Sequence, residues 1–146
     1  MIKGISLKKL NKIPTDGGNV LHFLKKQDPE FENFGEIYFS ELTKNFIRAW
    51  KKHNRMKMNL CVPKGKVAFV FFDDRHNSLS SNQFQTITLS EDNYSRITVE
   101  KGIWFGFKGL AKNSLIANLA SIEHDPSEVQ RCSLDQIEFD WKSLKE

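Results

Sequence analysis

Cysteine is scarce in this sequence, and long apolar runs are missing from it. The two cysteines, Cys61 and Cys132, are far apart and form no Cys-x-x-Cys pair, so they support neither a zinc site nor the disulfide framework of a secreted domain. The opening stretch, MIKGISLKKLNK, lacks the apolar core of a signal peptide, and no run approaches the length of a membrane span. We therefore expect a cytoplasmic protein that does not associate with membranes.

A large excess of charge of one sign is also lacking. The net charge is +4 for 146 residues, of which 27% are charged and 39% hydrophobic. A scattered charge of this size is compatible with an anionic small ligand or with none, and it does not indicate a nucleic-acid partner. The length predicts a single domain over residues 1–146, and the 12 phenylalanines predict an aromatic-rich core.

Amphipathic stretches of helix length are few, and short strand-like runs separated by Gly, Asn, Asp and Pro take their place. The runs are IKGISL, VLHFLKK, EIYFSEL, FIRAWKKH, MKMNLCV, KVAFVFFDD, FQTITLS, RITVEKGIWFGFKG, SLIANLAS and QIEFDW. This spacing predicts an all-β sandwich or barrel. KVAFVFFDD is apolar on both faces and predicts a central strand. DPSEVQ predicts one helical turn, with Asp125 as N-cap and Pro126 at the first position.

The run FIRAWKKHNR gathers cationic and titratable side chains at one strand end. Alternation predicts two faces, one with Ile47, Ala49, Lys51 and His53 and the other with Arg48, Trp50 and Lys52. The first face passes from apolar to cationic, as in a strand that rises from the packed bottom of a barrel to its polar mouth. Taken alone, the same residues could equally decorate a solvated strand end.

The order of these segments resembles the RmlC-like cupins, the dTDP-4-dehydrorhamnose 3,5-epimerase family. IRAWKKH resembles the family's Arg-Gly-Leu-His-Tyr-Gln strand, and PKGKVAFVFFDDR resembles its Gly-x-Val…Asp-x-Arg stretch. SEDNYSRITVEKGIWFGF resembles the segment that ends in Gly-Phe-Ala-His-Gly-Phe, and HDPSEVQRCSLDQIEFDW resembles the closing segment. The resemblance implies a cupin-type double-stranded β-helix, a jelly-roll barrel, that forms a homodimer through its N-terminal strands.

The resemblance also implies a set of site residues, with departures. The family's catalytic histidine falls on Lys51, its orienting aspartate on Asp135, and its acidic tyrosine on Asn118. His53 follows Lys51 by two positions, where related sugar ketoisomerases carry a second active-site histidine. Phe105 stands at the histidine of the Gly-Phe-Ala-His-Gly-Phe motif.

Epimerisation next to a ketone needs a base, a group that holds the enolate oxygen and an acid on the opposite face. We expect His53 to act as the base, with Asp135 fixing its tautomer. Lys51 is then placed to hold the enolate, and Tyr38, on the preceding strand, is a substitute acid.

Several other residues are candidates for substrate binding. Arg48, Arg55 and Arg75 are expected to pair with a diphosphate, because guanidinium forks match phosphate oxygens. Asn118 lies on a face that otherwise looks buried and so needs partners, and Trp50 is a candidate for stacking on a nucleotide base. We expect no metal and no other cofactor, because Lys51 and Phe105 replace histidines that metal-binding cupins use.

These features lead to one main functional hypothesis and two alternatives. The main hypothesis is an epimerase or isomerase of a dTDP-linked 4-keto-6-deoxyhexose in surface-polysaccharide biosynthesis. The first alternative is a catalytically silent cupin that binds a nucleotide sugar or regulates a partner enzyme, as the absence of the family tyrosine suggests. The second is a 3,4-ketoisomerase, which His53 suggests.

Overall fold

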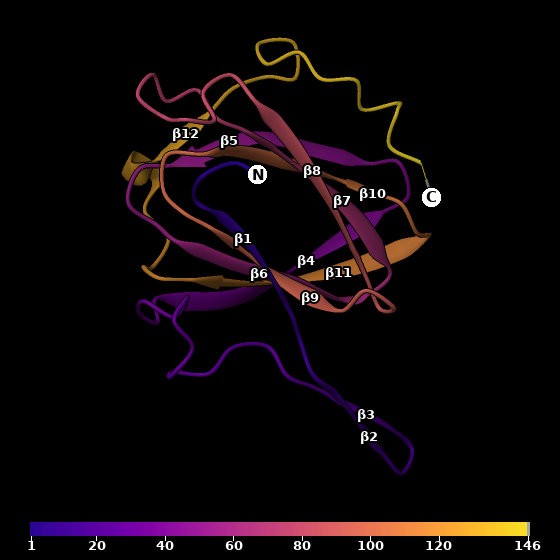
Figure 1. Ribbon diagram of the computed structural model, residues 1–146. Coiled ribbons are helices and arrows are strands. Elements are labelled where there is room, and N and C mark those ends of the chain that lie inside the picture. The colour runs from indigo at the N-terminus through magenta and orange to yellow at the C-terminus, as the bar shows by residue number, and fades with distance from the viewer. Residues whose placement is uncertain (146) are drawn as a thin grey trace.

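Two five-stranded antiparallel sheets face each other in the computed structural model, which describes residues 1–145 (Figure 1). The β4 sheet runs in the order β1 (Ile5–Lys9), β9 (Ser95–Val99), β6 (Met58–Lys64), β11 (Asn113–Ala120) and β4 (Glu36–Thr43). The β5 sheet runs in the order β12 (Val129–Arg131), β5 (Ile47–His53), β10 (Trp104–Gly109), β7 (Lys66–Phe72) and β8 (Phe84–Ser90). The all-β barrel expected from the strand spacing is confirmed.

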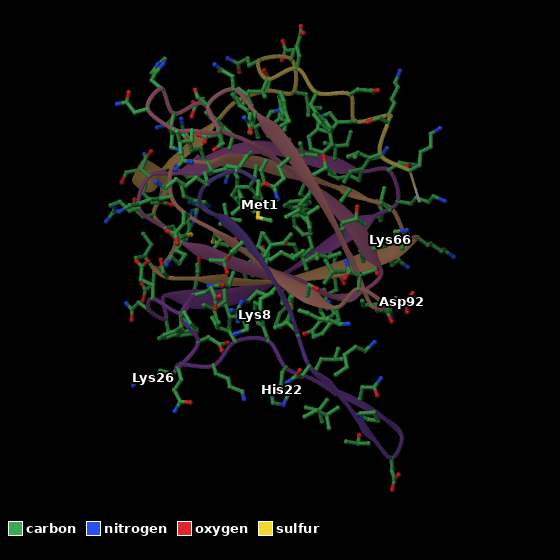
Figure 2. All side chains as sticks on the ribbon, viewed as in Figure 1. Met1, Lys8, His22, Lys26, Lys66 and Asp92 are labelled. Atoms are coloured by element: carbon green, nitrogen blue, oxygen red, sulfur yellow. The ribbon has the colours of Figure 1, made fainter. Side chains whose placement is uncertain are left out.

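A hairpin of β2 (Lys12–Thr15) and β3 (Gly18–Leu21) projects away from the two sheets (Figure 1). His22 marks the point where this hairpin rejoins the body (Figure 2). All side chains of β2 are exposed, and among them Ile13 retains 44% of its surface. An isolated two-stranded hairpin is marginally stable in water, so this arm lacks the packing that stabilises the rest of the fold.

The main core lies between the sheets and is rich in phenylalanine, as the composition predicts. Phe69 and Phe71 on β7 and Phe105 and Phe107 on β10 point into it, and each is at most 6% exposed. A second cluster covers the outer face of the β5 sheet, where Trp50 packs against Trp141 with ring centroids 5.2 Å apart. The C-terminal segment therefore closes the outer side of this sheet.

Local signals account for most of the strand boundaries. The turn after β6 contains Gly65 at φ +83°, a conformation that favours glycine, and a Cβ there would lie 2.4 Å from the carbonyl oxygen of Asn113. β7 lies between β10 and β8, as its two apolar faces predict. Asp125 caps a 3₁₀ turn, Pro126–Glu128, by accepting a hydrogen bond from the Ser127 amide, so the expected helical turn is confirmed.

Three expectations about strands differ from the structure. QIEFDW is not a strand, because Ile137 and Trp141 serve as anchors of an irregular segment that packs on the β5 sheet. VLHFLKK is a strand only as far as Leu21. RITVEKGIWFGFKG divides into β9 and β10, with Gly102 at φ +82° in the turn between them.

Candidate functional site

A cavity of about 500 Å³ opens between the two sheets beside the middle of β5. The residues that line it are Tyr38, Ser40, Arg48, Ala49, Trp50, Lys51, Phe105, Phe107, Asn118, His124 and Arg131. Its walls come from β4 and β11 on one side and from β5, β10 and β12 on the other. Three of the lining side chains are cations, and an anion is therefore the kind of ligand that this cavity attracts.

An irregularity in β5 brings two of these cations together. Phe105 pairs with Lys51 but Phe107 pairs with Arg48, so β5 carries one more residue than β10 over this stretch. This is the arrangement of a β-bulge, which re-aims side chains. Gly106 lies against the bulge, where a Cβ would come within 2.3 Å of the Ala49 side chain.

The bulge corrects the expected alternation along β5. Ile47 packs with the Trp50 cluster on the outer face of the sheet, whereas Ala49 contacts that cluster and also lines the cavity. Arg48, which was expected on the opposite face from Lys51, lines the same cavity. Lys52 does point outward, where its ammonium lies 2.7 Å from Asp74.

Lys51 is the cation set deepest in the cavity wall. It is half-buried, its ammonium lies 4.9 Å from the centre of the Phe105 ring, and Arg131 is its neighbour across the β12–β5 pair. Burial lowers the pKa of Lys51 to about 8, and the charges of Arg131 and Arg48 contribute to the shift. The amine therefore exchanges its proton near neutral pH.

His53 lies on the same side of β5 but is not among the residues that line the cavity. The residue is 8% exposed, and its Nδ1 is in hydrogen-bond contact with Glu128. Burial lowers the pKa of His53, with added repulsion from Lys51 and Arg131, although the Glu128 contact opposes the shift. His53 is thus neutral at pH 7, Nδ1 donates to Glu128, and Nε2 is buried without a hydrogen-bond partner among the described residues.

Glu128 occupies the place that the sequence interpretation assigned to Asp135. Burial alone would raise the pKa of Glu128, but hydrogen bonds from His53 and from the amide of Arg55 outweigh it and lower the pKa. Its carboxylate also accepts from the Asn54 amide at 3.1 Å. Asp135 instead lies exposed in a turn, where its pKa is lowered by a hydrogen bond from Ser133. No sequence pattern distinguished Glu128, since the 3₁₀ turn that carries it looks like an ordinary surface turn.

Tyr38 and Asn118 face each other across the β4–β11 pair and both line the cavity. The Asn118 amide donates to the Tyr38 carbonyl at 3.2 Å and to Ser40 Oγ at 3.1 Å, which supplies the partners that its buried position demands. Burial raises the pKa of Tyr38, and the nearby charge of Glu36 adds to the shift. The phenol therefore keeps its proton at neutral pH and can donate it.

The remaining predicted binding residues lie outside the cavity or on its margin. Arg55 forms a surface ion pair with Asp125 at 2.6 Å, and Arg75 binds the buried carboxylate of Asp73 at 2.7 Å. Trp50 borders the cavity, but its indole N–H donates to the Ile137 carbonyl on the outer face.

Sequence reasoning missed two residues that line the cavity. These are Arg131 and His124, which come from the segment around the 3₁₀ turn.

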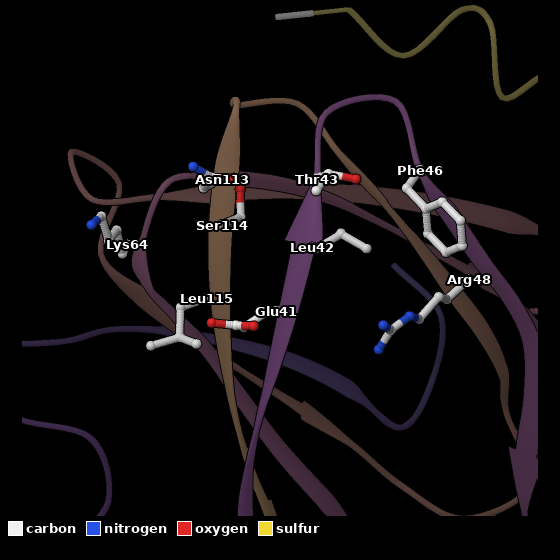
Figure 3. A pocket seen from close by; sticks show the side chains of 9 residues that line it. All are labelled: Glu41, Leu42, Thr43, Phe46, Arg48, Lys64, Asn113, Ser114 and Leu115. Atoms are coloured by element: carbon white, nitrogen blue, oxygen red, sulfur yellow. The ribbon is translucent and has the colours of Figure 1, made fainter.

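A second, outer pocket of about 640 Å³ adjoins the first through Arg48, which lines both (Figure 3). Figure 3 shows Arg48 beside the exposed ring of Phe46, whose centroid is 6.0 Å from the guanidinium carbon. Arg48 therefore lies where a ligand that fills the inner cavity would emerge toward the surface.

Residues 1–145, the part of the chain that the structure describes, contain neither a metal-type cluster of side chains nor a helix that could span a membrane. No three histidine, cysteine, aspartate or glutamate side chains in this range come together as they do around a metal ion. Over the same residues, no helix has the length and apolar character needed to cross a membrane.

Comparison with known proteins places the fold. No family model matches the sequence. A dTDP-sugar isomerase from Desulfovibrio desulfuricans is 36% identical, and the alignment covers 99% of this chain and 94% of that one with a TM-score of 0.94. A dTDP-4-dehydrorhamnose 3,5-epimerase from Elizabethkingia anophelis shares the fold at 16% identity, covering 97% and 82% of the two chains with a TM-score of 0.82.

A curated relative also matches the chain over nearly its whole length. The spore coat polysaccharide biosynthesis protein SpsL of Bacillus subtilis is 24% identical over 148 residues, which cover 98% of each protein. The expected cupin-type fold is confirmed by the solved structures. From its identity to the solved isomerase over nearly the full length of both proteins, this chain belongs to the RmlC-like cupin family of dTDP-sugar epimerases and isomerases.

Proposed function

We propose that this protein epimerises or isomerises a dTDP-linked 4-keto-6-deoxyhexose by moving a proton on a carbon next to the ketone. The observation that carries the proposal is the inner cavity, where Arg48, Lys51 and Arg131 surround a space that Tyr38 reaches from the opposite sheet. Permanent positive charge stabilises an enolate, and a lysine and a phenol are able to exchange protons. The dTDP-sugar isomerase of Desulfovibrio desulfuricans supports the substrate class.

Arg48 gives the substrate an orientation in this proposal. The sugar occupies the inner cavity, and the diphosphate lies at its mouth, where Arg48 and Arg131 are both exposed. Arginine matches the geometry of phosphate oxygens. The curated name of the Bacillus subtilis relative, a spore coat polysaccharide biosynthesis protein, supports a role in making a surface polysaccharide.

The test is proton exchange in deuterated water. The protein is incubated with dTDP-4-keto-6-deoxyglucose, and the C3 and C5 proton signals are followed by NMR. We expect one of these signals to disappear with time, because an enolate formed in the cavity takes up deuterium when it is reprotonated. Absence of exchange with this and other 4-keto-6-deoxy nucleotide sugars would contradict the proposal.

A silent nucleotide-sugar binder is the second candidate, because Asn118 stands where the family resemblance expects the acidic tyrosine. Tyr38 lies directly opposite Asn118 and supplies a phenol from the neighbouring strand, which favours the enzyme. The two candidates differ in one combination of results. A rise in melting temperature with dTDP but no proton exchange would support the silent binder.

We also propose a homodimer built on the projecting hairpin and the outer face of the β4 sheet. Ile13 and Val20 on the hairpin are 44% and 49% exposed, and Ile37 and Phe39 on β4 are 46% and 60% exposed. Exposed apolar groups of this kind mark interaction surfaces. Sedimentation should give twice the chain mass, and Phe39→Lys should lower it to one chain; a monomeric wild-type protein would contradict the proposal.

A cytoplasmic location completes the proposal. Cys61 and Cys132 are both unpaired, which fits a reducing compartment. Fractionation of the source cells should place the protein with cytoplasmic markers; recovery with a membrane or extracellular fraction would contradict this location.

A further inference from the structure

We infer that Lys51, rather than His53, is the base that takes the proton from the sugar, an assignment that rests on the proposed function. The base is then a primary amine and not a histidine imidazole.

Access to the cavity separates the candidates. Among its lining residues, Lys51 and His124 carry the nitrogen bases, an amine and an imidazole. His124 lies exposed in the loop before the 3₁₀ turn, at the rim. Lys51 is held on both sides, by β10 and by β12, so its amine projects from a fixed strand into the space where the sugar would lie.

His53 is oriented like a base but lies behind the wall of the cavity. Glu128 holds its Nδ1, and its Nε2 is buried among residues that include Phe105, whose ring centroid is 6.1 Å away. A base must come within about 3 Å of the proton that it abstracts. The sugar therefore meets the Lys51 amine, and the neutral His53 beside it adds no positive charge of its own.

The charges around Lys51 set its proton affinity. Arg48 faces it from the same strand and Arg131 from β12, while Glu128, at the 3₁₀ turn, acts in the opposite sense and raises its pKa. Tyr38 approaches from β4 with its proton retained. Burial and the two arginines prevail, so a useful fraction of the amine is neutral at the pH of the cytoplasm.

The proposed step transfers one proton and one electron pair. The lone pair of neutral Lys51 takes the proton from the carbon next to the ketone, and the C–H electrons form a carbon–carbon double bond as the carbonyl π pair moves to oxygen. Lys51 becomes an ammonium and the ketone becomes an enolate, whose negative oxygen is stabilised by Arg48 or Arg131. Return of the same proton restores the substrate, whereas donation from the Tyr38 hydroxyl to the opposite face inverts the carbon. The Tyr38 phenolate then regains a proton from water, and Lys51 releases one.

Exchange measurements on four variants test the assignment, with dTDP-4-keto-6-deoxyglucose in deuterated water. Lys51→Met should slow exchange by about 100-fold or more, as expected for loss of a general base. Lys51→Arg should slow it as much, because arginine stays charged and cannot accept a proton. Lys51→His should retain measurable exchange, because imidazole is a base. His53→Gln should keep the rate within about fivefold, because His53 is buried outside the cavity lining and does not reach the sugar.

Two results would overturn the inference while leaving the proposed function intact. One is wild-type-like exchange in Lys51→Arg, which would mean that Lys51 acts only as a fixed cation. The other is loss of exchange in His53→Gln with dTDP still raising its melting temperature, which would mean that His53 is the base. Absence of exchange in the wild-type protein would instead remove the proposed function and the inference with it.

The pH profile of the wild-type protein gives a measurement that needs no variant. If Lys51 is the base, the exchange rate rises with pH and levels off above about 8, where the amine becomes neutral. A His53 base, whose pKa lies below its usual value of 6.5, would give a rate that is already level at pH 7. The second shape would overturn the inference.

Discussion

Arg96 on the β4 sheet and the three cavity cations beside β5 differ in what surrounds them. Arg96, on β9, is completely buried and reaches Asp28 at 2.9 Å and Glu30 at 2.6 Å. In the part of the chain that the structure describes, no carboxylate lies within ion-pair distance of the cavity cations beside β5, which are Arg48, Lys51 and Arg131. Paired charge fixes the protein's own segments, whereas unpaired charge around a cavity is available to a ligand.

The difference extends to the segments that the charges hold. Arg96 also donates to the Phe23 carbonyl at 3.0 Å, so one side chain ties the connection between β3 and β4 to the outer face of the β4 sheet. The cavity cations instead repel one another, which is reflected in the lowered pKa of Lys51. Arg96 should therefore contribute to the stability of the fold, and the cavity cations to ligand binding and reaction.

The largest effect on stability is expected from Arg96→Met. This change leaves two carboxylates beside an apolar side chain and should lower the free energy of unfolding by about 3 kcal/mol or more, measured by urea denaturation. Lys8→Met is the matched control, because Lys8 contacts the same carboxylates from a more exposed position and should contribute less than about 1 kcal/mol. Equal losses in the two variants would contradict the comparison.

The Arg96 contribution should also depend on pH in a defined sense. The hydrogen bond from Arg96, with one from the Lys25 amide, lowers the pKa of Asp28. A carboxyl group with a lowered pKa in the folded state stabilises that state above its unfolded pKa and loses this contribution as it becomes protonated. The stability difference between wild type and Arg96→Met should therefore shrink as the pH falls below about 4.

Lys51→Met should raise the free energy of unfolding, whereas Arg96→Met lowers it, and the change should be smaller. Because the folded state holds the lysine pKa near 8 against 10.5 ordinarily, removal of the charge should raise the free energy of unfolding by about 2 kcal/mol at pH 7. Between pH 8 and 10.5 the unfolded chain binds more protons, so the wild type should gain stability with rising pH and the variant should not. A destabilised Lys51→Met protein would show that the lysine is well paired.

Arg131→Met should affect ligand binding more than stability. Loss of one arginine–phosphate contact should weaken dTDP binding about tenfold, measured by calorimetry, with the melting temperature of the free protein little changed. Arg55→Met is the control, because Arg55 is exposed like Arg131 but forms an ion pair with Asp125 away from the cavity. Equal binding losses in both variants would indicate a general effect of net charge.

The smallest effect is expected from Asp135→Asn. Asp135 is exposed and its hydrogen bonds lie within its own turn, so both the free energy of unfolding and the rate of proton exchange should change little. Glu128→Gln should lower the stability more, because Glu128 supports His53 and accepts from the amides of Asn54 and Arg55, while exchange should stay within about fivefold, as in His53→Gln. A larger effect of Asp135→Asn than of Glu128→Gln would restore Asp135 as the carboxylate that orients His53.

Most of the fold could be predicted from the sequence because its signals are local. Apolar content on both faces predicts the central position of β7, and glycines mark the turns after β6 and β9. The exceptions depend on long-range packing. QIEFDW has the composition of a strand, but its indole and isoleucine side chains fill the outer face of the β5 sheet rather than pairing with a neighbouring strand.

The site was predictable only in part, for a geometric reason. Strand alternation separates Arg48 from Lys51, and only the register with β10 reveals the bulge that unites them. The orienting role of Glu128 depends on a contact across 75 positions of sequence, which no local pattern encodes. Lys51 was found because the family resemblance puts a histidine at its position, and Tyr38 because it lies on the preceding strand; both line the cavity.

The C-terminal segment has a consequence for how the chain folds during synthesis. The buried ammonium of Lys108 donates to the carbonyls of Trp141 and Leu144, and β12 covers the edge of β5. These partners leave the ribosome after the strands that they complete. Until then, the nascent chain has an open strand edge and a lysine without its acceptors, both of which favour association with other chains. Completion of the barrel therefore waits for residues 129–144 to emerge, and the nascent chain is most vulnerable to aggregation in the interval between synthesis of β10 and synthesis of this segment.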